Sequence, residues 1–177
     1  MIGEKDFKRQ QQIMACLSSL PRKMLSVYEL DNVPEFILHD VCSEHCFNLI
    51  RAAYFVDNPD FNSCKGVAGF CRTEAYHAGD DLWQQPENFS KFMGESPFNQ
   101  KVRSIVLESV LRNKRLYDHV TQEIAPQLGF SNPAWCTWHL KYFNEGFIVF
   151  EKGDLADELF DQHFINTLHL LGFCAIR

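Results

Sequence analysis

Alternating apolar and polar residues near the end of the chain predict a β-hairpin. Trp138, Leu140 and Tyr142 recur at every second position, which is the period of a strand with one buried face. Residues 144–146, Asn-Glu-Gly, supply turn chemistry, and an apolar run at 147–150 predicts the second strand. A further β-rich run covers 164–171. We therefore expect a sheet in the last part of the chain.

Helical periodicity predicts three helices that would flank this sheet. Apolar residues recur at helical spacing from Phe7 to Leu20, where Pro21 is expected to end the helix. Ser43 is a suitable N-cap for a second helix, and Pro126 follows a third apolar pattern. The helices are expected near residues 6–19, 43–56 and 101–124. Shorter strands are expected at 24–29, 34–41 and 67–76.

The composition is that of one folded domain over residues 1–177. Hydrophobic residues make up 46% of the chain, and 16 Phe provide enough apolar volume for a sizeable core, which excludes a disordered protein. The net charge of -6 argues against a broad nucleic-acid interface, because phosphate binding depends on clustered Lys and Arg.

The cysteines and the N-terminus bear on the cellular compartment. Seven cysteines at irregular spacing do not form a disulfide framework. The chain has no run of 18 apolar residues, and glutamines at 10–12 occupy the place of the apolar core of a signal peptide. We expect a cytoplasmic protein with reduced thiols and no membrane span.

Two blocks of the chain resemble the prolyl-hydroxylase-like branch of the Fe(II)/2-oxoglutarate dioxygenases. Residues 34–50, PEFILHDVCSEHCFNLI, are similar to the strand and helix that open the catalytic domain in that family. Further on, Tyr142 and Gly146 stand near its Tyr-x-x-Gly pair, Asp154 matches the Asp of its His-x-Asp motif, and Leu171 matches the Leu of its Tyr-Leu-Asn motif. The resemblance implies an α+β fold whose sheet is a partial or remodelled double-stranded β-helix, like a jelly roll, flanked by helices.

The chain departs from the family at the residues that bind iron and 2-oxoglutarate. Lys152 replaces the first iron-binding His, and an ammonium group has no lone pair to donate to a metal. Glu151 would point to the opposite face of a regular strand, and Leu170 lacks the hydroxyl of the family's Tyr. No counterpart of the second His, or of the basic residue that binds 2-oxoglutarate, follows Asp154. Asp154 is thus the one match to the metal triad, and we expect a non-catalytic binding or regulatory protein without a cofactor.

Other site chemistries stay open at this stage. An iron-dependent oxygenase with reassigned ligands would centre on Asp154 and use Fe(II) and 2-oxoglutarate. Only one of His163 and His169 could join Asp154, since positions six apart on a strand are about 20 Å apart. The remaining candidates are a zinc site or a cysteine nucleophile: Cys42, His45 and Cys46, with Cys64, Cys71 or His77; Cys136 with His139; and the loop cluster His77, Asp80 and Asp81.

A third hypothesis is a protein-interaction module. If the run at 164–171 is the last strand, it leaves an unpaired sheet edge near the end of the given sequence. A second copy of the chain or another protein could pair with that edge, forming a homodimer or a mixed complex.

Overall fold

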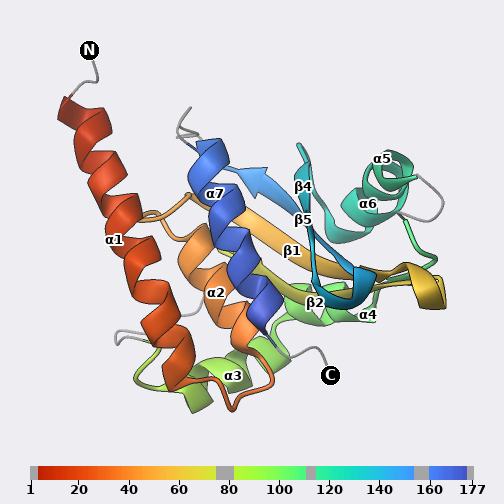
Figure 1. The fold of residues 1–177 in the computed structure, drawn as a ribbon, viewed down its shortest axis with the longest axis horizontal. Coiled ribbons are helices and arrows are strands. Elements are labelled where there is room, and N and C mark those ends of the chain that lie inside the picture. The colour runs from red at the N-terminus through yellow and green to blue at the C-terminus, as the bar shows by residue number, and fades with distance from the viewer. Residues whose placement is uncertain (1–3, 75–81, 111–114, 154–159, 175–177) are drawn as a thin grey trace.

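A computed structural model describes residues 4–74, 82–110, 115–153 and 160–174. Over these residues the chain is an α+β protein with one five-stranded antiparallel sheet in the order β3-β2-β1-β5-β4, covered by helices (Figure 1). The strands are β1 Leu49–Asn58, β2 Ser63–Cys71, β3 Val106–Leu107, β4 Ala134–His139 and β5 Glu145–Lys152. The helices are α1 Glu4–Ser26, α2 Val33–Cys42, α3 Pro86–Glu95, α4 Pro97–Ser104, α5 Leu116–Asp118, α6 Ala125–Leu128 and α7 Phe160–Leu168. Short 3-10 segments are η1 Pro59–Phe61, η3 Lys141–Phe143 and η4 His169–Phe173, and a π-helical segment, η2 His119–Ile124, joins α5 to α6.

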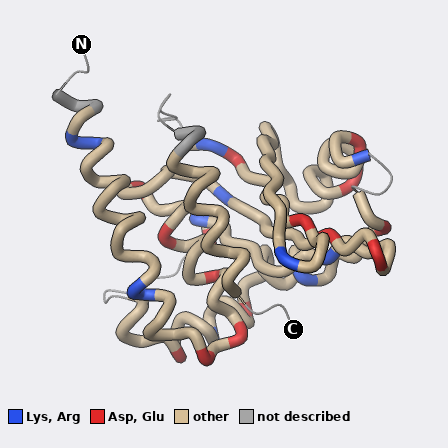
Figure 2. The backbone as a smooth tube through the Cα atoms, in the orientation of Figure 1, with Lys and Arg blue, Asp and Glu red and all other residues tan. Residues whose placement is uncertain are grey.

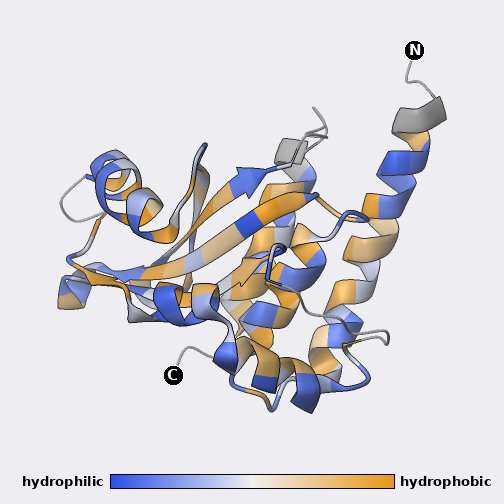
Figure 3. Cartoon of the chain, turned by 180° about the vertical axis from the view of Figure 1, so that it is seen from behind, coloured by the Kyte–Doolittle hydropathy of each residue, from blue (hydrophilic) through white to orange (hydrophobic). Residues whose placement is uncertain are grey.

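The central strand β1 separates two hydrophobic cores. Successive side chains of a strand point to opposite faces, so Tyr54 enters one core and Phe55 the other. On the first face Tyr54 stacks on Trp138, and the core is completed by residues of α1, α2, α3 and α7. On the second face Phe55 stacks on Phe147, against residues of α4, η2 and α6. Figure 3 shows the central strands as largely hydrophobic, as burial on both faces requires.

Two predicted elements exchange their type in the structure. The helix expected at 43–56 is wrong, because its second half is the strand β1. A strand buried on both faces has no polar alternation, so its continuous apolar run also fits a helical stripe. The strand expected at 34–41 is wrong as well, since these residues form α2 with Pro34 in its first turn, where a missing N–H costs nothing.

The other predicted elements also differ from the structure. Helix α1 continues through Pro21 to Ser26, which removes the strand expected at 24–29, and buried Leu20 holds its second half against the core. The run at 164–171 lies in α7 and η4 and is not a strand. The helix expected at 101–124 is divided, because α4 ends at Ser104 and β3 follows. Part of the strand expected at 67–76 is confirmed as β2, and residues 75–76 lie outside the described residues.

The C-terminal hairpin is confirmed, with its turn three residues earlier than expected. Strands β4 and β5 pair from Ala134↔Phe150 to His139↔Glu145. The two central residues of the turn, Tyr142 and Phe143, have φ of 60° and 58°, the left-handed pair that a tight hairpin turn requires. Both rings are almost fully exposed. The conformation is therefore imposed by the hairpin and not by a glycine or by packing of these rings.

A bulge in β2 brings α4 close to the sheet. Tyr54 pairs with Ala68 and Phe55 with Gly66, so Val67 is an extra residue on β2. The extra residue places Gly66 and Gly69, three apart, under the same helix. A Cβ at Gly66 would lie 1.9 Å from the Val102 carbonyl oxygen, and one at Gly69 would lie 2.6 Å from the Val102 side chain. The absence of these side chains allows α4 to pack directly on β2.

We predict that Gly66→Ala destabilises the protein by roughly 3 kcal/mol, because the new methyl group would meet helix backbone and α4 would have to move. Urea unfolding followed by far-UV circular dichroism measures the change. Gly94→Ala in α3 is the matched control: nothing lies within 4 Å of its Cβ position, so it should stabilise by about 0.5–1 kcal/mol. Equal effects of the two substitutions would contradict the close approach of α4 to β2.

Candidate functional site

A cavity of about 590 Å³ opens between the end of the β1–β2 pair, α4 and α6. We call it the α4 cavity. Its volume lies in the range of small-molecule sites. Its lining consists of Arg51, Cys71, Thr73, Glu74, Pro97, Phe98, Gln100, Lys101, Ser104 and Leu128.

The elements of the fold set the chemical character of the cavity. Arg51 of β1 lies opposite Cys71, the last residue of β2, and α4 supplies both an apolar ring, Phe98, and a cation, Lys101. Leu128 comes from the end of α6. Phe98 and Leu128 are buried, whereas Lys101 is exposed. The cavity therefore has an apolar base and a partly charged rim.

Arg51 anchors the wall of the α4 cavity. Its Nη1 donates to the carbonyl oxygens of Leu128 (3.3 Å) and Gly129 (2.9 Å), where the last carbonyls of α6 carry partial negative charge. Its guanidinium also lies 5.8 Å from the centre of the Phe130 ring. Among the described residues, no group accepts a hydrogen bond from Nη2, so this end of the guanidinium keeps donors for a ligand.

Glu151 is the counter-ion of Arg51. Its Oε2 lies 3.1 Å from Arg51 Nε, although the two atoms are not aligned as a hydrogen bond. Its Oε1 accepts weakly from the backbone N–H groups of Ser131 and Asn132 at 3.2 and 3.3 Å. The pair therefore ties the turn after α6 to β1 and β5. These contacts occupy Glu151, the residue that sequence reasoning weighed as a substitute iron ligand beside Lys152.

Glu74 lies on the rim of the cavity but is occupied by α4. It accepts from Ser96 Oγ at 2.5 Å and from the Phe98 N–H at 2.7 Å, so it caps the first turn of the helix. Lys101, three residues along α4 from Phe98, has no ion-pair partner among the described residues. Glu74 keeps its negative charge, but Ser96 and the Phe98 N–H already occupy both of its oxygens. Lys101 and the Nη2 edge of Arg51 have donors that no described residue uses, so these two groups favour a hydrogen-bond-accepting or anionic group. Acidic and basic positions are otherwise interspersed along the chain (Figure 2).

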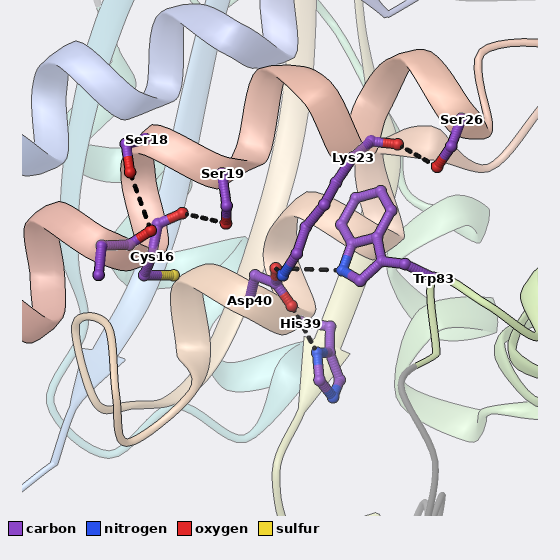
Figure 4. A network of polar contacts seen from close by, with 9 residues as sticks. Cys16, Ser18, Ser19, Lys23, Ser26, His39, Asp40 and Trp83 are labelled. Atoms are coloured by element: carbon purple, nitrogen blue, oxygen red, sulfur yellow. Dashed lines mark hydrogen bonds and ion pairs between the residues drawn. The ribbon is translucent and has the colours of Figure 1, made fainter.

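A second polar cluster joins α1 to α2, away from the α4 cavity. Asp40 is 7% exposed and contacts Lys23 Nζ at 2.9 Å, His39 Nδ1 at 3.2 Å and Trp83 Nε1 at 3.1 Å (Figure 4). Burial by itself raises the pKa of Asp40, but the hydrogen bond to His39 and the bond and charge of Lys23 outweigh it, so the pKa lies below its ordinary value. Both oxygens of Asp40 have partners, and none of these residues lines the α4 cavity, which favours a structural role.

A third buried carboxylate, Glu35 of α2, reaches α4. Its Oε1 accepts from Arg103 Nη2 at 2.5 Å and from Asn99 Nδ2 at 3.3 Å, while Oε2 has no hydrogen-bond partner. Asn99 in turn accepts from the Gly69 N–H at 2.8 Å. Burial raises the pKa of Glu35, and Arg103 offsets only part of that effect. Glu35 therefore joins α2 to the helix that forms the α4 cavity, at some cost in desolvation.

The predicted metal residues are only partly within the described residues. Asp154, His77, Asp80 and Asp81 lie outside them. Lys152 is the exposed last residue of β5. Tyr142 is in the hairpin turn, and Gly146 faces the Trp138 ring, which its Cβ would meet at 2.6 Å.

The histidine pair and the C-terminal leucines occupy helical backbone, not a strand. His163 lies in α7 and His169 in η4, so the extended-strand distance between them does not apply. Leu170 is partly buried and Leu171 fully buried in η4. These two leucines contribute to the first core.

The cysteine candidates are distributed over both cores. Cys42 and Cys46 are buried in the first core, while Cys64 and Cys71 belong to the second. The described part of the chain contains no group of three His, Cys, Asp or Glu residues arranged to hold a metal ion. On β4, Cys136 packs toward the first core, whereas His139 is exposed and paired with Glu145. This arrangement does not activate Cys136 as a nucleophile.

Sequence reasoning missed the residues that matter most in the structure. Arg51 was given no role, Asp40 lies inside the block 34–50 without a role of its own, and Lys101 was expected at the start of a helix near 101–124. A usable signal existed for Arg51, because it is the one charged residue in the apolar run at 49–56. A charge in such a run must find partners when the element is buried.

Comparison with known proteins gives no family. No family model, curated protein or solved structure matches this chain. None of the described helices is long and apolar enough to cross a membrane.

We predict that Asp40→Asn lowers the free energy of unfolding by about 2 kcal/mol at pH 7, because Lys23 loses its buried counter-charge. Since the folded pKa of Asp40 is lowered, this stabilisation is present above the unfolded pKa, near 3.8, and is lost as pH falls through the folded pKa. The difference between wild type and variant in urea unfolding should shrink below pH 3.8. Asp118→Asn, in an exposed pair 3.6 Å from Arg115, is the control and should change stability by less than about 0.5 kcal/mol. A difference that is independent of pH would contradict the charged pairing.

Proposed function

We propose that this chain is a non-catalytic binding protein for a small molecule that occupies the α4 cavity. The observation that carries the proposal is the combination of a volume of about 590 Å³, an apolar base at Phe98 and Leu128, and cationic groups at Arg51 and Lys101. This combination fits an amphipathic ligand with an apolar body and an anionic or hydrogen-bond-accepting end.

The construction of the cavity supports binding by a preformed site. Gly66 and Gly69 seat α4 on β2, Glu74 caps the helix, and the Arg51–Glu151 pair fixes the opposite wall. A site whose walls are held in this way loses little conformational entropy when a ligand enters.

The resemblance to Fe(II)/2-oxoglutarate dioxygenases remains a separate proposal. A double-stranded β-helix consists of two facing sheets, whereas the five described strands belong to one sheet with helices on both faces. The block at 34–50 also begins with a helix in place of the family's strand. An iron-dependent reaction with reassigned ligands would depend on Asp154 and thus rests on the sequence alone.

A ligand series with one tail and three head groups tests the binding proposal. We expect octanoate, at roughly ten times its Kd, to raise Tm by about 3–5 °C, since such binding adds about 1.4 kcal/mol to stability. Octanol should raise Tm less than octanoate does. Octylammonium should raise it least, because its positive charge is repelled by Lys101 and Arg51. Lys101→Met should weaken the binding of octanoate about fivefold, as expected for loss of a partly exposed ion pair. The binding of octanol should not change.

The control variant for this series is Lys91→Met, which removes an exposed charge from α3, outside the cavity lining. It should leave all three responses as in the wild type. Failure of all three ligands to change Tm, or an identical octanoate response in Lys101→Met, would contradict the proposed site.

A second candidate function, pairing with another chain through a sheet edge, is favoured by strand β4. This strand is the last in the sheet order, and its residues Ala134 to Trp138 include no Pro, Lys, Arg, Asp or Glu. Natural edge strands usually carry such residues to prevent pairing with other chains. The edge differs from the one expected from the sequence, because the run at 164–171 is helical.

We predict that the protein forms a concentration-dependent dimer through β4 and that Thr137→Lys abolishes it. Thr137 is exposed on the edge strand, where a lysine is a common guard against pairing. Light scattering across a dilution series measures the mass. Ser18→Lys, on the exposed face of α1, adds the same charge elsewhere and should leave the dimer intact. A monomer mass at every concentration would rule out self-pairing.

A further inference from the structure

The α4 cavity contains a thiol that simple ligand binding does not use. Cys71, the last residue of β2, lines this cavity and is 6% exposed. It pairs in register with Arg51 of β1, so both side chains lie on the sheet face that carries the second core. Gly69 precedes Cys71 by two residues on the same face, and a Cβ there would lie 3.1 Å from the Phe98 ring. The thiol therefore has an apolar surface beside it and a cation opposite it on the neighbouring strand.

A hydroxyl group fixes the position of the Cys71 sulfur. Sγ of Cys71 lies 3.1 Å from Oγ1 of Thr73, and the two form a hydrogen bond in which either atom can be the donor. Thr73 also lines the cavity. When the thiol gives up its proton, the Thr73 hydroxyl can donate to the sulfur. Cys71 forms no disulfide, so its sulfur is available for reaction.

The lining supplies three further features that define a ligand for this sulfur. Phe98 and Leu128 offer an apolar base to a hydrocarbon chain. Arg51 has Nη2 donors that no described residue uses, which suit a carbonyl oxygen, and Lys101 at the rim suits an anion. A medium-chain acyl thioester of a phosphorylated thiol combines a chain, a carbonyl group and an anionic end. A polar disulfide would leave the apolar base unused.

We propose that Cys71 is a self-acylation site that accepts a medium-chain acyl group from an acyl thioester such as octanoyl-coenzyme A. The proposal rests on the amphipathic ligand proposed for the α4 cavity. The Cys71 sulfur attacks the carbonyl carbon, so a new C–S bond forms and the C–S bond to coenzyme A breaks. The proton of the protein thiol passes through solvent to the released thiol of coenzyme A. The products are an octanoyl thioester on Cys71 and free coenzyme A, and no oxidant or reductant takes part.

The lining residues would serve different parts of the acyl thioester. The Nη2 edge of Arg51 donates to the carbonyl oxygen, where negative charge develops as the sulfur attacks. Lys101 pairs with the phosphates of coenzyme A at the rim. The octanoyl chain lies against Phe98 and Leu128, and it stays there after the transfer. Acylation should therefore abolish the rise in Tm caused by octanoate, because the attached chain occupies the same apolar base.

The test is incubation of the folded full-length chain with octanoyl-coenzyme A, followed by mass spectrometry of the intact chain and of its fragments. Cleavage after Lys and Arg places Cys71 in residues 66–72, apart from every other cysteine. We expect one octanoyl group per chain, attached to this fragment. Neutral hydroxylamine should remove it, since this reagent cleaves a thioester and leaves an amide on lysine intact. An unmodified fragment 66–72 from a chain that stays folded would overturn the proposal.

Three other cysteines provide an internal control. Cys16, Cys136 and Cys174 are more exposed than Cys71 and line no part of the α4 cavity. Iodoacetamide, a small neutral reagent, should modify these three faster than Cys71. Octanoyl-coenzyme A should instead modify Cys71 roughly tenfold faster than any of them, because the cavity holds the thioester beside its sulfur. The same order of reactivity with both reagents would overturn the proposal, and this comparison needs no variant.

The roles of the chain and of the charge are tested separately. Acetyl-coenzyme A has the same thioester and phosphates but lacks the chain, so it should acylate Cys71 roughly tenfold more slowly. Lys101→Met should slow octanoyl transfer about fivefold, as expected for loss of a partly exposed ion pair. Lys91→Met, outside the cavity lining, should leave the rate as in the wild type. Equal rates with acetyl and octanoyl thioesters would contradict the use of the apolar base.

The outcome for Cys71 is separable from that of octanoate binding. If octanoate raises Tm but octanoyl-coenzyme A transfers no acyl group, the cavity binds its ligand and only the acylation of Cys71 is wrong. If octanoate has no effect and no transfer occurs, the proposed binding function is wrong as well.

Discussion

The burial of β1 on both faces is the constraint on which the rest of the fold depends. Its alternating side chains enter two separate cores, Tyr54 on one face and Phe55 on the other, so each face needs its own layer of helices. Strands β2 and β5 satisfy its backbone hydrogen bonds on both sides. Arg51 is one of two charged residues in this strand, the other being Asp57, and the contacts of Arg51 with Glu151 and the end of α6 place one wall of the α4 cavity.

The elements that were predicted correctly from the sequence are those determined by residues close together in the chain. The hairpin of β4 and β5 follows from alternation and turn residues, and α1 follows from a helical stripe on a helix that lies at the surface. The prediction of an α+β chain with helices around a sheet is confirmed. An apolar stripe along a helix, or an alternation of apolar and polar residues along a strand, identifies the element only where one of its faces is exposed to water.

The errors arise where both faces are buried or where partners are distant in sequence. Most residues of α2 and β1 are buried, so the spacing of apolar residues did not distinguish the helix from the strand, and the two predictions were exchanged. The α4 cavity depends on Arg51, Lys101 and Leu128 meeting across long intervals of sequence, which no local pattern reports.

The bulge at Val67 has a consequence for the way this sequence can vary in length. A strand alternates its two faces at every residue, so one extra residue exchanges the faces of everything beyond it. In β2 the extra residue keeps Gly66 and Gly69 both under α4. Loss of one residue at this point would turn glycine away from the helix and present a side chain in its place. Homologous chains should therefore tolerate insertions in the loops around β2 but conserve the residue count between these two glycines.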